Sequence, residues 1–339
     1  MRGVRPEQPE PFLRGGAWPA TEDVPYPRAD PGDASRLPMD TWAAATVPAT
    51  VRLEFVGDAE AVEVAYRTTT DDLGYRGRRA GTTFSLWRGG RCLDEQRAVL
   101  GQGVVRLAAG GDAAAPAVVY LPEGMKPVVL SLRAEGGTVE PAPRGPRWVA
   151  YGDSVLEGWA ASSPAAAWPA GAARTYGLEV FNLGYAGAAR GEIVSAEQVA
   201  SLPAAVISIS HGTNCWTRVP HSTAMMRETT RAFLEVVRQG HPTTPIVVAT
   251  PVVRPDAEDT PNRLGASLAD LRAAMAAAVQ ERVDGGDKDI TLLHGLAMLE
   301  ARHLTDGIHP GDEGHSVLAT AIGSEVATAA AAAAAMGAR

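Results

Sequence analysis

Ser154 stands directly after Gly152 and Asp153, at the end of a short apolar run. A turn from a strand into a helix at this point would expose the serine hydroxyl and aim the backbone N–H of Ser154 at an incoming oxyanion. A serine hydroxyl attacks a carbonyl carbon only when a base takes up its proton, and imidazole suits that task near neutral pH. The alternative for Ser154 is an ordinary helix N-cap, which involves no chemistry.

A base for Ser154 has to come from the second half of the chain, because His211 is the first of the seven histidines. His309 follows Asp306 with two residues between them, so one short turn can present both side chains. The carboxylate would then hold one ring nitrogen, fix the tautomer and stabilise the imidazolium. We predict that Ser154 is the nucleophile, His309 the general base and Asp306 the orienting acid. The alternative for the pair is a solvated loop with an incidental histidine.

His303, Asp306 and His309 recur every three residues, which is also a spacing of metal ligands. No fourth ligand follows nearby in the sequence, and a serine partner accounts for two of the three residues. The glycine-rich segment 184–191 lacks the G-x-G-x-x-G order of a dinucleotide loop. The prediction is therefore chemistry by protein side chains alone, with no metal ion and no cofactor.

Two more residues are candidate donors to a developing oxyanion, together with the N–H of Ser154. Asn214 follows an apolar run and carries an amide N–H, and Gly187 lets a substrate approach its backbone N–H closely. Turn formation is the competing explanation for both residues. Aromatic side chains near the same segments are candidate walls of a substrate pocket, with core packing as the alternative: Trp159, Trp168, Tyr185 and Trp216.

The elements that must position these residues alternate between apolar strands and long helices after residue 146. Strands are expected at 147–151, 179–183, 204–210, 246–250 and 290–293, and the clearest helices at 223–239 and 265–283. Such alternation forces parallel pairing. The predicted fold is a five-stranded parallel, doubly wound, flavodoxin-like α/β domain over 147–339. Ligands bind at the carboxyl ends of strands in such sheets, and the candidate residues follow those ends.

The front half has a different pattern, in which apolar residues alternate in short runs separated by Gly-rich turns such as Gly89-Gly90 and Gly110-Gly111. This pattern predicts a jelly-roll-like antiparallel β-sandwich domain, including an N-terminal extension, over 1–140. Three prolines within residues 141–146 favour an extended connector. The domain boundary is placed there.

Composition excludes several classes of partner. The net charge is −8 and no basic stripe appears, so nucleic acid is not an expected partner. The first forty residues lack the apolar run of a signal peptide, and the alanine-rich tail is predicted to be a terminal helix and no membrane anchor. A cytoplasmic location is expected, with Cys92 and Cys215 as free thiols.

Taken together, four segments resemble the SGNH (GDSL) hydrolase family: Gly152-Asp153-Ser154-Val155, Asn182 to Gly187, Gly212-Thr213-Asn214 and Asp306-Gly307-Ile308-His309-Pro310. They occur in the family's order, with valine in place of the usual leucine at 155 and cysteine at 215 where aspartate is frequent. The resemblance implies the triad and the three oxyanion donors proposed above. The front half is similar to the sandwich that precedes some members, including carbohydrate esterases and an acyltransferase that adds salicylate to a tetracycline-type polyketide.

These observations predict a serine esterase that cleaves small-molecule or carbohydrate acyl esters through an acyl-enzyme. If an alcohol replaces water in the second step, the same residues make an acyltransferase acting on a natural product such as a polyketide. Its partners are thus an acyl ester, or an acyl donor together with an alcohol acceptor. A third alternative is an inactive carbohydrate-binding protein.

Overall fold

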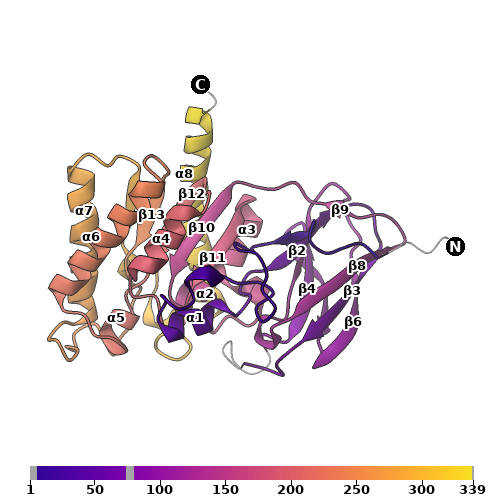
Figure 1. Ribbon diagram of the computed structural model, residues 1–339, viewed down its shortest axis with the longest axis horizontal. Coiled ribbons are helices and arrows are strands. Elements are labelled where there is room, and N and C mark those ends of the chain that lie inside the picture. The colour runs from indigo at the N-terminus through magenta and orange to yellow at the C-terminus, as the bar shows by residue number, and fades with distance from the viewer. Residues whose placement is uncertain (1–5, 74–79, 338–339) are drawn as a thin grey trace.

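A computed structural model describes residues 6–73 and 80–337 of the chain. Antiparallel strands from the first part of the chain lie on one side of the molecule and a parallel sheet with its helices on the other (Figure 1). The predicted fold class, a doubly wound parallel sheet preceded by an antiparallel β-structure, is confirmed. The division into domains at residues 140–147 stays a prediction.

The parallel sheet has five strands in the order β11-β10-β12-β13-β14. Their bounds are β10 Arg147–Gly152, β11 Glu179–Gly184, β12 Val206–Ser210, β13 Ile246–Ala249 and β14 Ile290–Leu293. The first strand in sequence therefore has the second on one side and the third on the other, which is the flavodoxin-like order. All but the last of these strands are almost entirely buried, because helices cover both faces of the sheet.

The helices divide between the two faces of the sheet. One hydrophobic cluster joins the sheet to α4, α6 and α7, and another joins it to α3 and α8. The helices of this part are α2 Ser154–Glu157, α3 Trp168–Tyr176, α4 Ile193–Ser201, α5 Asn214–Thr217, α6 Thr223–Gly240, α7 Leu268–Asp284 and α8 Asp312–Gly337. α7 begins with a capping box between Ser267 and Asp270.

The antiparallel part consists of two sheets around a common apolar core. One sheet has the order β1-β2-β7-β4-β5, with β9 paired to β2, and the other has the order β6-β3-β8. The strands are β1 Leu13–Arg14, β2 Arg52–Val56, β3 Ala61–Thr68, β4 Thr83–Arg88, β5 Arg91–Arg97, β6 Gly101–Ala108, β7 Ala117–Tyr120, β8 Val128–Glu135 and β9 Glu140–Pro141. The Gly89-Gly90 turn joins β4 to β5, and both glycines have positive φ.

One segment before β2, residues 28–47, packs with the α/β part of the molecule and not with the sandwich. Ala29, Leu37 and Ala45 are buried in the same hydrophobic cluster as Val149 and Tyr151 of β10. Ala45 ends α1 (Met39–Ala45), which lies beside the parallel sheet although in sequence it stands between β1 and β2 of the sandwich (Figure 1). The segment 28–47 is therefore part of the α/β core.

The C-terminal helix α8 is long and apolar enough between Asp312 and Ala335 to cross a membrane, judged by length and composition alone. Its apolar character comes largely from alanine, and four of its residues pack against the sheet and α3: Leu318, Ile322, Val326 and Ala330. The helix thus uses one face in the protein core, and its last turns extend beyond the neighbouring elements (Figure 1). Cys92 is exposed and Cys215 is buried, and both are free thiols, as predicted.

Candidate active site

The strand register brings the candidate segments to one edge of the parallel sheet. Gly152 at the end of β10 lies opposite Gly184 of β11 and Ser210 of β12. The loops after these strands therefore start side by side, at the position where the strand order reverses. A Cβ on Gly152 would lie 2.4 Å from the carbonyl oxygen of Ser210, so only glycine fits between the neighbouring strands.

Ser154, His309 and Asp306 form a continuous hydrogen-bonded chain. The Ser154 hydroxyl lies 2.9 Å from Nε2 of His309, and Nδ1 of His309 lies 2.7 Å from Oδ2 of Asp306. Ser154 is the first residue of α2, whose N-cap is Asp153, so the serine hydroxyl is not used in capping. In this geometry a hydroxyl can pass its proton to an imidazole whose other nitrogen is held by a carboxylate.

Asp306 holds both the imidazole ring of His309 and the backbone of the loop that carries His309. Its Oδ1 accepts hydrogen bonds from the backbone N–H of Ile308 at 3.0 Å and of His309 at 2.7 Å. Burial alone would raise the pKa of Asp306, but the hydrogen bonds from the His309 ring and from these two N–H groups outweigh it and lower the pKa. The carboxylate is therefore ionised at neutral pH.

The two other candidate oxyanion donors lie next to each other. Asn214 begins α5, is buried, and donates its side-chain amide to the carbonyl oxygen of Ala188, the residue after Gly187. Gly187 has a φ of +70°, a conformation that strains other residues. The Asn214 bond thus ties the loop after β12 to the loop after β11.

Arg218, which the sequence analysis does not single out, lies against the loop that carries Gly187. A Cβ on Gly187 would meet Cζ and Nε of Arg218 at 3.3 Å. Arg218 is exposed and stands at the C-terminal end of α5, four residues after Asn214. That helical spacing is the signal that would have placed Arg218 on the same side as Asn214.

The aromatic candidates divide between the site and the core. The ring of Trp159 lies 5.3 Å from the ring of His309, centroid to centroid, so Trp159 borders the triad. Trp216 is partly exposed, with its indole N–H donating to Thr260 and the guanidinium of Arg254 above its ring. Tyr185, which the sequence analysis predicts to border a pocket, is fully buried, and its hydroxyl donates to the carbonyl oxygen of Arg28. Trp168 is also a core residue, packed against Trp148.

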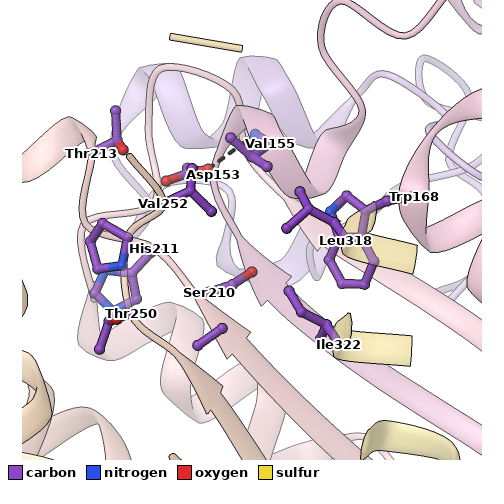
Figure 2. Close-up of a pocket in the computed structure, with 12 residues that line it drawn as sticks. Asp153, Val155, Trp168, Ser210, His211, Thr213, Thr250, Val252, Leu318 and Ile322 are labelled. Atoms are coloured by element: carbon purple, nitrogen blue, oxygen red, sulfur yellow. Dashed lines mark hydrogen bonds between the residues drawn. The ribbon is translucent and has the colours of Figure 1, made fainter. Parts of the chain in front are cut away.

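Asp153 borders a small cavity between the ends of β12 and β13 and helix α8 (Figure 2). The cavity measures about 20 Å³, enough for one water molecule, and its wall includes His211, Thr250 and Trp168. Burial raises the pKa of Asp153 to about 6, although the backbone N–H of Val155 and the nearby His309 act in the opposite direction. The folded protein therefore holds a proton on Asp153 in a pH range where the unfolded chain has lost it.

Asp153→Asn is expected to stabilise the protein at neutral pH. The raised pKa means that the wild-type free energy of unfolding falls as pH rises from about 4 to 6, by about 2 kcal/mol. Asparagine keeps an oxygen to accept the Val155 N–H bond but carries no buried charge, so this fall should disappear in the variant. Urea unfolding between pH 4 and 8 measures both curves.

Asp270→Asn is the matched control for this measurement, because hydrogen bonds from Ser267 lower the pKa of Asp270. Its carboxylate contributes stability above the pKa of the unfolded chain, and that contribution is lost as pH falls. The control variant should therefore lose stability at neutral pH. Equal pH dependence in wild type and Asp153→Asn would contradict the assignment of a buried carboxylate.

The α/β part of the chain is similar to a known protein family. Residues 150–317 match the model of the GDSL-like lipase/acylhydrolase family. Among curated proteins, none matches the sequence significantly.

Several solved structures have a similar fold over nearly the whole chain. A protein described as a GDSL-like lipase from Bacteroides ovatus is 20% identical with a TM-score of 0.80, covering 96% of this chain and 98% of that one. The salicylyl-acyltransferase SsfX3 from a tetracycline biosynthetic pathway is 24% identical with a TM-score of 0.80, covering 98% of both chains. A family two carbohydrate esterase from Clostridium thermocellum is 13% identical with a TM-score of 0.61, covering 81% and 90%. The sandwich and the α/β part therefore recur together in other proteins.

Proposed function

Because the chain belongs to the GDSL-like lipase/acylhydrolase family, through residues 150–317, we propose that Ser154 attacks the carbonyl carbon of an acyl ester. His309 takes up the hydroxyl proton through Nε2, and Asp306 stabilises the resulting imidazolium through Nδ1. The single observation that carries the proposal is the pair of short contacts on either side of the imidazole, at 2.9 Å and 2.7 Å.

The reaction then proceeds in two steps, formation of an acyl-enzyme and its hydrolysis. The tetrahedral intermediate collapses, the bond to the alcohol breaks, and His309 returns its proton to the leaving alkoxide. The acyl group remains on Ser154 as an ester. Water then attacks that ester, gives its proton to His309, and releases the acid while the serine hydroxyl recovers a proton.

The oxyanion of both tetrahedral intermediates is held by the N–H groups of Ser154 and Gly187 and by the amide of Asn214. An amide nitrogen carries two hydrogens, and the bond from Asn214 to Ala188 uses one of them. The other is the donor assigned to the substrate. Donors fixed in advance stabilise the charge that develops in the transition state, because no reorganisation is needed at that moment.

Hydrolysis is the proposed outcome, and solvent exposure is the observation that favours it over transfer. The Asp306 side chain is 52% exposed, so the acid of the triad lies at an open edge of the site. An enzyme that transfers an acyl group has to keep water away from the acyl-enzyme. The proposed substrate is a small-molecule or carbohydrate acyl ester. Its binding site would be bordered by Trp159, beside His309, and by Arg218, beside Gly187.

The experiment that tests the proposal is covalent labelling with a fluorophosphonate, which reacts with activated serines. Mass spectrometry of the digested protein should place the adduct on Ser154, and heat-denatured protein should give no adduct. An adduct on another serine, or none on the folded protein, would contradict the mechanism and favour the inactive carbohydrate-binding alternative.

The same preparation distinguishes hydrolysis from acyl transfer. With an aryl acetate as acyl donor, we expect the free acid as the main product, with little change when a simple alcohol or a sugar is added. Product analysis by mass spectrometry measures the partition. Preferential formation of the new ester at low alcohol concentration would instead assign the protein to the acyltransferases.

A further inference from the structure

The loop that carries Gly187 is held by residues from the N-terminal segment 28–47. We propose that Arg28 and Asp40 are positioning residues for the oxyanion hole, acting through Glu157 and Arg190. This inference rests on the function proposed above, in which the N–H of Gly187 binds the oxyanion. The segment lies outside residues 150–317, the part that matches the family model.

Arg28 is buried between the segment and the end of β11. Its side chain is 1% exposed and its guanidinium donates to backbone carbonyl oxygens on both sides. Within the segment it reaches the oxygen of Ala44 at 2.7 Å and that of Val47, and at β11 the oxygen of Asn182 at 3.0 Å and that of Gly184. The planar fork of donors thus fixes the point where β11 ends and the loop begins.

Glu157 extends this contact to the loop itself. It is buried at the end of α2, pairs with Arg28 at 3.3 Å, and accepts the backbone N–H of Ala186 at 2.8 Å. The hydroxyl of Tyr185 donates to the carbonyl oxygen of Arg28 at 2.7 Å. A buried carboxylate is stable only next to a compensating charge, so Glu157 can hold Ala186 because Arg28 is present.

Asp40 holds the other side of the loop through Arg190. The two oxygens of Asp40 accept from Nη1 and Nη2 of Arg190 at 2.9 Å and 3.0 Å, and the same Nη1 donates to the carbonyl oxygen of Gly187 at 3.2 Å. Such a bidentate pair fixes the plane of the guanidinium as well as its position. The Gly187 carbonyl is therefore oriented by a carboxylate of α1.

These contacts restrain the peptide groups on both sides of the oxyanion donor. Glu157 holds the peptide that ends in the Ala186 N–H, and Arg190 holds the peptide that begins with the Gly187 carbonyl. The peptide between them carries the Gly187 N–H, whose direction is set by its two neighbours. A tilt of this donor weakens binding of the transition state more than binding of the substrate, because the full charge exists only in the transition state.

Asp40→Asn is the primary test, because Asp40 is 41% exposed and its replacement leaves the buried residues in place. We expect kcat on an aryl acetate to fall about tenfold with KM within about twofold of wild type, since the donor is tilted and not removed. Asp40→Glu should recover part of kcat. Inhibition by phenylboronic acid, whose tetrahedral adduct with Ser154 places an oxygen in the hole, should weaken by a similar factor.

Asp33→Asn is the matched control in the same segment. Asp33 pairs with Arg36 at 2.8 Å and accepts from Gln198 of α4 at 3.3 Å, so it ties the segment to the α/β part without touching the loop 184–191. The change in charge is the same as in Asp40→Asn. Wild-type kcat in the control together with a reduced kcat in Asp40→Asn supports the proposal, and equal effects in both overturn it.

Glu157→Gln gives an independent second measurement, with thermal unfolding used to select conditions in which the variant is folded. We expect a loss of kcat larger than that of Asp40→Asn, again with little change in KM. Unchanged kcat in both variants would overturn the inference while Ser154→Ala remains inactive. Full activity of Ser154→Ala would instead refute the proposed function itself, so the two failures are distinguishable.

Discussion

Replacing Ser154 with alanine is expected to lower kcat on an aryl acetate by about 10⁵ to 10⁶-fold, because the acyl-enzyme can no longer form. The fold should be unaffected, since Asp153 and not Ser154 caps α2. A small rate above that of water should remain, because the oxyanion donors still bind the transition state. Initial rates at saturating substrate measure the loss.

Ser163→Ala is the control for this experiment. Ser163 precedes a short 3₁₀ helix of the same region and makes no side-chain capping bond, so the variant should keep wild-type kcat. The double variant Ser154→Ala/His309→Ala should be no slower than Ser154→Ala, because the two side chains act as one unit. Retention of more than about one hundredth of wild-type kcat by Ser154→Ala would rule out the serine mechanism.

Replacing Asp306 with asparagine is expected to lower kcat by about 10³ to 10⁴-fold at neutral pH. The amide can occupy the same space, yet it no longer compensates the positive charge of the imidazolium. The amide of asparagine can also donate a hydrogen bond to Nδ1 of His309. The ring proton then lies on Nε2, and a protonated Nε2 cannot accept the proton of Ser154. Steady-state kinetics measure the loss of kcat. The rate of labelling by a fluorophosphonate measures the loss at the step in which Ser154 attacks.

Asp312→Asn is the control for Asp306→Asn, because it removes one charge six residues away in the same exposed region. Asp312 accepts the backbone N–H of Ser162 at 2.8 Å and makes no contact with His309 among the described residues. Its kcat should stay near that of wild type. Similar losses in the two variants would show that the effect of Asp306→Asn comes from charge or folding and not from the orientation of His309.

Sequence patterns determined the architecture because each parallel strand is a continuous apolar run followed by a turn. All five predicted strands of the parallel sheet agree with the structure within two residues at either end. In the sandwich, the pattern of alternating apolar residues does not predict β5, because Arg91–Arg97 is polar and almost wholly exposed. The same pattern does not predict β7, because Ala117–Tyr120 is buried on both faces, in the sandwich core and at the interface with α3, and so does not alternate.

The sequence by itself also determined which residues are candidates for chemistry, since Ser154, Asp306 and His309 have side chains and spacing suited to a triad. The loops after β10, β11 and β12 lie at one edge of the sheet because these strands pair in parallel and in register. Parallel pairing follows from the alternation of strands and helices in the sequence. What the pattern cannot supply is the environment of each side chain. Tyr185 follows a strand end just as Ser154 does, yet its hydroxyl donates to the carbonyl oxygen of Arg28 in the core.

Only the tertiary structure decided which distant residues support the site. Arg28 and Asp40 lie between β1 and β2 of the sandwich in sequence, more than a hundred residues before the loop that they contact. The contacts of Arg28 have no local signature, because a guanidinium that binds backbone carbonyl oxygens imposes no residue type on its partners. Asp40 pairs with Arg190 from 150 positions away, so the sequence around Asp40 does not indicate that partner either. Local patterns record which face of an element is apolar, whereas long-range polar contacts arise only when packing brings separate segments together.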